Sequence, residues 1–148
     1  LANANTVIDA SVEHILDFFN FVDVNSIVIA NVEYPLMKPF FISSAINTMK
    51  VFGADSVISV LEENDNLYKH DGSGLKAFSG NTKLRFERDK VFREIGGIHA
   101  VSGSYFKEMK SIFGGRISHV VLDKHSAIKI EDCNDLVYMD CGFWGLKK

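Results

Sequence analysis

The side chains that could perform chemistry are dispersed along this sequence and form no complete catalytic motif. His119 and His125 are six residues apart, with no third ligand in helical or strand register, so a zinc site is not expected. Ser43 and Ser44 fall on a predicted helix, and no Ser-His-Asp or Cys-His order stands out. The spacing therefore favours neither zinc chemistry nor nucleophilic catalysis.

A glycine pair and a histidine on one predicted strand are candidates for contact with a ligand. Gly96 and Gly97 would let a ligand approach the backbone, since no side chain intervenes, but such a pair more often marks a strand bulge. His99 could face a pocket, but a lone histidine on an apolar strand is more often a core or edge residue. The sequence leaves both alternatives open for each candidate.

The elements that must position these residues follow from the apolar spacing. Ser11 can cap a helix with an apolar stripe, and Ser26–Ala30 is a short apolar run of the kind buried in a parallel sheet. Pro39 suits the first turn of a second helix, for which Gly53 is a natural C-cap. A second buried strand follows at Ser56–Val60. Strand, helix and strand with short joints predict a βαβ unit with a right-handed crossover.

The middle of the chain differs from this pattern. Glu62–Lys90 is polar and rich in turn signals, and its short segments Leu67–His70 and Leu75–Phe78 predict a hairpin that stands off the main sheet. The earlier pattern then resumes, with strands predicted at Gly97–Val101, His119–Leu122 and Ala127–Ile130 and helices capped by Ser104 and Asp132. The predicted class is α/β with a protruding polar excursion.

Composition narrows the range of partners. With 148 residues the chain is expected to form one domain, and a net charge of −3 with a pI near 5.9 provides no basic field for nucleic acid. No apolar run approaches the length of a membrane span, and Leu1–Thr6 lacks the basic start of a signal peptide. Cys133 and Cys141 are expected to be reduced thiols, which favours a cytoplasmic location.

Four ordered stretches cover nearly the whole chain: SIVIANVEYPL from Ser26, GADSVISV from Gly53, REIGGIHAV from Arg93 and SAIKIEDCNDL from Ser126. Together they resemble one enzyme family, the acylneuraminate and related CMP-sugar cytidylyltransferases. They are similar to the family's Q-P-T-S-P-L-R loop strand, its A-D-S-V-x-S-V strand, its N-G-A-I-Y strand and its S-I-D-I-D strand. The second and fourth are the more specific.

The resemblance implies a fold, a reaction and an assembly. The fold would be a Rossmann-like nucleotide-diphospho-sugar transferase fold, truncated at its N-terminus. The reaction would transfer CMP from CTP to a nonulosonic, sialic-acid-like or related sugar acid, with Mg²⁺ helping pyrophosphate to leave. The assembly would be a homodimer, formed through the excursion at residues 62–92.

The resemblance also implies particular site residues in the substrate loop and the excursion. Asn31 lies at the position of the family's Gln. Met37 replaces the family's Arg, and Lys38 is the cation next to that position. Glu33 brings negative charge to a place where an anionic ligand would pass. Arg85 is the best match to the family's sugar-contacting Arg. Lys38 and Arg85 are therefore the catalytic candidates, and Asn31, Gly96 and His99 the substrate-binding candidates.

On the metal-binding strand the resemblance assigns Glu131 as the tentative Mg²⁺ ligand. Lys129 stands where the family has its first Asp, so an ammonium replaces an oxygen ligand. A residual altered site at Glu131 and Asp132 is one interpretation. The favoured one is an exposed strand end followed by a helix-capping Asp.

The family's N-terminal loop, A-R-x-G-S-K, has no counterpart in these residues. Because that loop holds the nucleotide's phosphates in the family, this chain alone is not expected to turn over CTP. The alternative function is a non-catalytic, divergent cytidylyltransferase-like module for binding or assembly. Met37, Lys129 and the unmatched loop favour this alternative, whereas the core strands are neutral because packing alone would preserve them.

Overall fold

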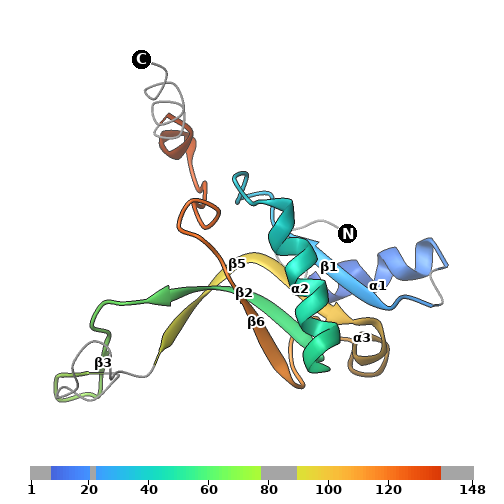
Figure 1. The fold of residues 1–148 in the computed structure, drawn as a ribbon, viewed down its shortest axis with the longest axis horizontal. Helices are drawn as coiled ribbons and strands as arrows, with labels where there is room; N and C mark the ends of the chain where they lie inside the picture. Colours follow the sequence, from blue (N-terminus) through green and yellow to red (C-terminus); the bar gives the residue numbers. More distant parts are fainter. Residues whose placement is uncertain (1–7, 21–22, 78–89, 138–148) are drawn as a thin grey trace.

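A mixed four-stranded sheet lies at the centre of the computed structural model, which describes residues 8–20, 23–77 and 90–137 (Figure 1). Its strand order is β1-β5-β2-β6, with bounds β1 Ser26–Ala30, β5 Val91–Ser102, β2 Ser56–Glu63 and β6 Ile117–Val121. Strand β5 is antiparallel to both β1 and β2, and β2 is parallel to β6. Strands β1, β2 and β6 therefore run in one direction, and their carboxyl ends lie at the same edge of the sheet.

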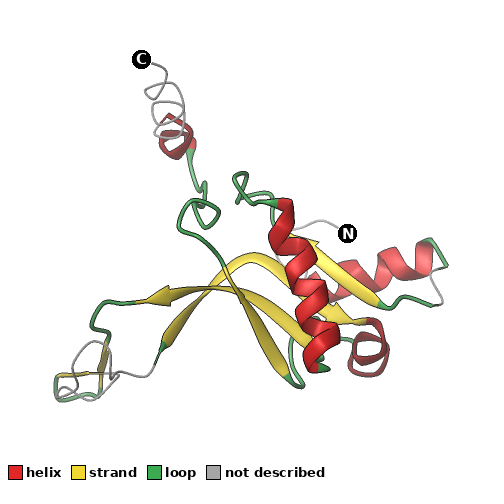
Figure 2. Ribbon diagram, viewed as in Figure 1, coloured by secondary structure: helices red, strands yellow, loops and turns green. Residues whose placement is uncertain are grey.

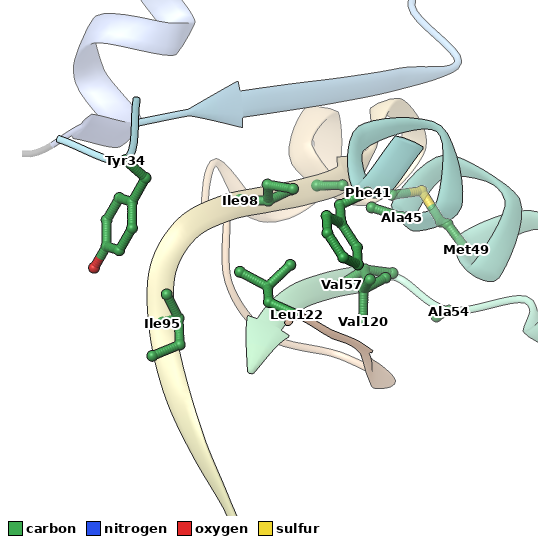
Figure 3. Packing of buried hydrophobic residues seen from close by; sticks show 11 residues of the cluster. Tyr34, Phe41, Ala45, Met49, Ala54, Val57, Ile95, Ile98, Val120 and Leu122 are labelled. Carbon is green, nitrogen blue, oxygen red and sulfur yellow. The ribbon is translucent and has the colours of Figure 1, made fainter. Parts of the chain in front are cut away.

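Helices cover both faces of this sheet (Figure 2). Helix α2, Pro39–Phe52, packs on one face. Figure 3 shows its inward residues Phe41, Ala45 and Met49 against Val57 and Val120 of the strands. Helices α1, Ile8–Phe18, and α3, Gly103–Met109, contribute to a second cluster made of Val12, Val101, Phe106 and Ile112. Burying each large side chain of this kind contributes about 1.5–3 kcal/mol.

The ends of α2 follow the sequence signals closely. Pro39 occupies the first turn, where a missing N–H costs nothing. Gly53 adopts the left-handed conformation at φ 58°, and its N–H donates to the Met49 carbonyl. The prediction of this helix from Pro39 to its C-cap is confirmed.

The helix caps elsewhere differ in part from the sequence prediction. Helix α1 already includes Ile8, so the predicted cap Ser11 lies inside the helix. The N-cap of α3 is Ser102, whose side chain accepts a hydrogen bond from the Tyr105 N–H at 3.2 Å, so the prediction of Ser104 was wrong by two residues. Asp132 does cap a helical segment at 133–137, since its Oδ1 accepts from the N–H groups of Asn134 and Asp135.

One prediction about strands is confirmed and one is wrong. Strands β1 and β2 are parallel and are joined through α2, as the predicted βαβ unit requires, although β5 lies between them in the sheet. The strand predicted at Ala127–Ile130 does not form, because residues 124–127 make a turn and 128–130 are irregular. Asp123 initiates this turn, since its carboxylate accepts the Ser126 N–H at 2.8 Å.

The predicted hairpin forms a small sheet of its own. Strands β3, Tyr68–His70, and β4, Leu75–Ala77, pair antiparallel and project away from the main sheet (Figure 1). Asp71 closes the turn by accepting the N–H groups of Ser73 and Gly74. Hydrogen bonds from Lys76, and then from Ser73, lower the pKa of the Asp71 carboxyl to about 2.

Of the helices in the described ranges, none has the length and apolar character that crossing a membrane requires.

Candidate functional site

Two loops leave the sheet at the edge where the parallel strands end. We call residues 31–38, which follow β1, the β1 loop, and residues 122–131, which follow β6, the β6 loop. In open α/β sheets, ligands bind outside the carboxyl ends of the strands, so this edge is the candidate site. The backbone joins the loops directly, because the Ile130 N–H donates to the Glu33 carbonyl at 2.8 Å.

An ion pair forms the first side-chain link between the loops. The Lys38 Nζ lies 2.6 Å from Asp123 Oδ2, with both side chains partly exposed. The pKa of Asp123 is lowered to about 2, chiefly by its hydrogen bond with Lys38 and then by the Ser126 N–H. The structure thus places the catalytic candidate Lys38 at the candidate edge, as a charged and accessible cation beside α2.

A second link consists of one ammonium between two carboxylates. The Lys129 Nζ lies 2.7 Å from Glu131 Oε1 and 3.3 Å from Glu33 Oε2. These hydrogen bonds, the one to Glu131 being the stronger cause, raise the pKa of Lys129 well above its usual range. Asn31 orients Glu33, since its Oδ1 accepts the Glu33 N–H at 3.0 Å and its Nδ2 donates to Glu33 Oε2 at 3.3 Å. Asn31, Lys38 and Glu131 therefore lie on joined loops.

The glycine pair lies where β5 bends beneath the β1 loop. The register between β2 and β5 shifts between Ile58 and Ser59, which confirms the bulge interpretation. The Asn31 N–H donates to the Gly97 carbonyl at 3.0 Å. A Cβ on Gly97 would lie 2.6 Å from Met37 Cε and 3.4 Å from Tyr34 Cγ, so side chains of the protein itself fill that space. Figure 3 shows Tyr34 beside this bend.

A buried serine that the sequence analysis missed holds this bend. Ser59 is fully buried, and its hydroxyl donates to the Ile95 carbonyl and accepts the Ile98 N–H at 2.9 Å. These two bonds satisfy backbone groups that the irregular register would otherwise leave without partners. The available signal was a serine in the middle of an apolar, β-branched strand.

His99 lies apart from the joined loops. Its register partners are Ile29 and Ile58, and Ile29 packs against the cluster that involves α1 and α3, so His99 is on the sheet face opposite α2. Its Nε2 lies 3.4 Å from Glu94 Oε1, and its Nδ1 is buried without a hydrogen-bond partner. Tyr34 packs on the α2 face, so the structure does not bring His99 together with the β1 loop.

The residues around Glu131 do not fit a divalent cation as they are arranged. The Glu131 carboxylate pairs with an ammonium, and the Asp132 carboxylate caps the helical segment at 133–137. Asp135 Oδ2 accepts the N–H groups of Glu131 and Asp132. Within the described ranges, no three His, Cys, Asp or Glu side chains gather as a metal site. Arg85 lies outside the described residues, and its role, like that of Gly96, stays a prediction.

Comparisons with known proteins define the class of fold. No family model matches the sequence, and no curated protein matches it. Among solved structures, it is similar to 4-diphosphocytidyl-2C-methyl-D-erythritol synthase from Anaerococcus prevotii, with TM-score 0.63 and 15% identity over 95% of this chain and 68% of that one. It is also similar to 2-C-methyl-D-erythritol 4-phosphate cytidylyltransferase from Thermus thermophilus, with TM-score 0.50 and 14% identity over 92% and 69% of the two chains.

The chain therefore has a cytidylyltransferase-like α/β fold, as the four sequence stretches predicted. At such low identity the likeness shows the fold alone. The names of both neighbours contain a methylerythritol derivative and no acylneuraminate, so the finer resemblance to acylneuraminate enzymes rests on the sequence stretches.

Proposed function

We propose that this chain is a CMP-sugar synthetase-like nucleotidyltransferase domain. In the complete protein it would transfer CMP from CTP to a sialic-acid-like sugar acid, in the cytoplasm. The observation that supports this most is the joining of the β1 and β6 loops at the carboxyl ends of parallel strands in a cytidylyltransferase-like fold. The four sequence stretches favour the sugar acid over other acceptors.

The proposed reaction is a displacement at the α-phosphorus of CTP. The anomeric hydroxyl oxygen of the sugar forms the new P–O bond and releases its proton to solvent, while the bond to pyrophosphate breaks and pyrophosphate leaves with the bonding electrons. Such transfers depend on positioning and on neutralising charge. Lys38 would supply one cation at the site, and Asp123 would hold its side chain toward the β6 loop. Mg²⁺ would enter on the phosphates of the nucleotide, as this ion often does.

The test is pyrophosphate release by the complete protein from CTP and N-acetylneuraminic acid with Mg²⁺. Lys38→Ala should lower kcat/KM by about tenfold or more, because a hydrogen bond to a charged group is lost. Lys50→Ala is the matched control, since Lys50 is an exposed lysine in the last turn of α2, and it should leave the rate unchanged. If the unmodified protein neither releases pyrophosphate nor binds CTP in calorimetry, the proposal is wrong.

A second candidate function is a non-catalytic binding or assembly module. It is favoured by Lys129, whose ammonium forms an ion pair with the Glu131 carboxylate. It is also favoured by Met37 and Tyr34, whose side chains fill the space over Gly97. Such a module would use the β3–β4 hairpin, within residues 62–92, to form a homodimer. CTP binding separates the two functions, because the module predicts dimerisation without any affinity for the nucleotide.

A further inference from the structure

Lys129 occupies a position between carboxylates of two different loops. Its Nζ contacts Glu131 Oε1 of the β6 loop at 2.7 Å and Glu33 Oε2 of the β1 loop at 3.3 Å. Two acidic side chains brought this close would repel each other if no cation lay between them. The ammonium supplies that cation from within the chain.

A divalent metal ion would bind the same carboxylate oxygens of Glu33 and Glu131 at the position that the ammonium now occupies. Mg²⁺ binds carboxylate oxygens at about 2.0–2.1 Å and needs them free of competing positive charge. Here the ammonium already lies 2.7 Å from Glu131 Oε1 and 3.3 Å from Glu33 Oε2, so it occupies the space between these oxygens. The ammonium and a divalent ion would therefore exclude each other.

We propose that the Lys129 ammonium is a built-in cation that holds Glu33 and Glu131 in place of a divalent metal ion. This locus accordingly binds neither Mg²⁺ nor Mn²⁺, and removal of the ammonium converts it into a divalent-cation site. The inference refines the proposed function, because it removes Glu131 as a Mg²⁺ ligand while Lys129 is present.

The loops would remain together in a variant that lacks the ammonium. The backbone bond from Ile130 to Glu33, at 2.8 Å, and the ion pair between Lys38 and Asp123, at 2.6 Å, do not involve Lys129. Asn31 still orients the Glu33 carboxylate. The Glu131 side chain is 69% exposed, so it can adjust to a metal ion without disturbing the core.

The test is a titration of the purified chain with Mn²⁺, followed by electron paramagnetic resonance. Lys129→Ala should bind one Mn²⁺ at concentrations at which the unmodified chain binds none at this locus, since one positive charge is removed a few ångströms from a solvent-exposed divalent ion. Lys129→Arg keeps the positive charge and should gain no affinity. Adding Glu131→Gln to Lys129→Ala should abolish the gain.

Two outcomes would overturn the proposal. One is Mn²⁺ binding by the unmodified chain that Glu131→Gln removes. The other is equal Mn²⁺ affinity in the unmodified chain, Lys129→Ala and Lys129→Gln, with circular dichroism showing that the variants are folded. The measurement reads metal binding and not turnover, so a chain that releases no pyrophosphate but gains Mn²⁺ on Lys129→Ala would refute the proposed function alone.

Discussion

At the scale of single residues, two ion pairs link the β1 loop to the β6 loop. Glu33, which the sequence placed as an unfavourable charge for an anionic ligand, is compensated by Lys129. Lys38 is compensated in turn by Asp123, a residue that the sequence did not single out. Both ion pairs are exposed enough that salt screens them, so their role is to orient the loops more than to stabilise the fold.

The ion pair of Lys38 predicts a pH dependence. The pKa of Asp123 is about 2 in the folded chain, below its ordinary value of about 3.9. The stabilisation it provides is therefore complete above about pH 4 and is lost as the pH falls toward 2. Lys38→Met should move the Asp123 midpoint upward in a carboxyl-carbon NMR titration, whereas Lys50→Met should not. An unchanged midpoint in Lys38→Met would contradict the assigned cause.

Gly103, at the start of α3, allows a close approach of two backbone segments. A Cβ there would lie 1.6 Å from the Val24 carbonyl oxygen, and the Gly103 N–H donates to the Asn25 carbonyl at 3.0 Å. Gly103→Ala must therefore shift backbone, and we expect a loss of about 3 kcal/mol in the free energy of unfolding, measured in urea. Gly74→Ala is the control, since nothing lies within 4 Å of its Cβ position. Equal stability of the two variants would refute this contact.

Sequence reasoning can single out a residue that lies in a recognisable motif, but it misses a residue whose partners are distant in the chain. The sequence singles out Asn31, Lys38 and Glu131 as candidates because each lies in a stretch that resembles a known motif, and their roles in binding or catalysis stay predictions. Asp123 and Ser59 act through partners that are 85 and 39 positions away, and sequence spacing carries no information on such contacts.

At the scale of elements, the bend of β5 positions the β1 loop relative to the sheet. The loop's Asn31 donates to Gly97 in the bend, and Ser59 holds the bend from the neighbouring strand. The position of the candidate site thus depends on one irregularity in an otherwise regular ladder.

Ser59→Ala tests this support. It would leave the buried Ile98 N–H without its acceptor, which costs about 1–3 kcal/mol. The expected result is a lower midpoint of thermal unfolding, together with changed amide shifts at Asn31 and Gly97. Ser104→Ala removes an exposed hydroxyl and should change the midpoint little. A Ser59→Ala chain as stable as Ser104→Ala would show that the bend needs no such support.

Elements with complete local signals were predictable, and those decided by distant partners were not. Helix α2 has its Pro, its apolar stripe and its Gly in sequence, so the prediction was accurate. Ala127–Ile130 has strand-like residues, but the Ile130 N–H bonds to Glu33 of a loop and the Asp123 turn bends the chain just before it. Nor does chain order reveal that β5 inserts between β1 and β2.

At the scale of the whole molecule, the hairpin predicts an assembly. The β3–β4 hairpin projects from the sheet and exposes apolar side chains, with Leu75 71% and Tyr68 54% accessible (Figure 1). Burying such residues against a second copy is favourable, so we expect a homodimer by sedimentation velocity. The double change Tyr68→Ser and Leu75→Ser should shift it toward monomer. A monomer at high concentration in the unmodified protein would refute the assembly.

We propose that the β1 and β6 loops, at the carboxyl ends of parallel strands, form the ligand site of this cytidylyltransferase-like fold. The most direct test maps the amide chemical shifts of the complete, isotope-labelled protein as CTP and Mg²⁺ are added. Among residues 8–20, 23–77 and 90–137, we expect the changes to concentrate in 31–38 and 122–131. Changes confined to other surfaces, such as the groove between α1 and α3 lined by Asp17 and Lys107, or no changes at saturating CTP, would contradict it.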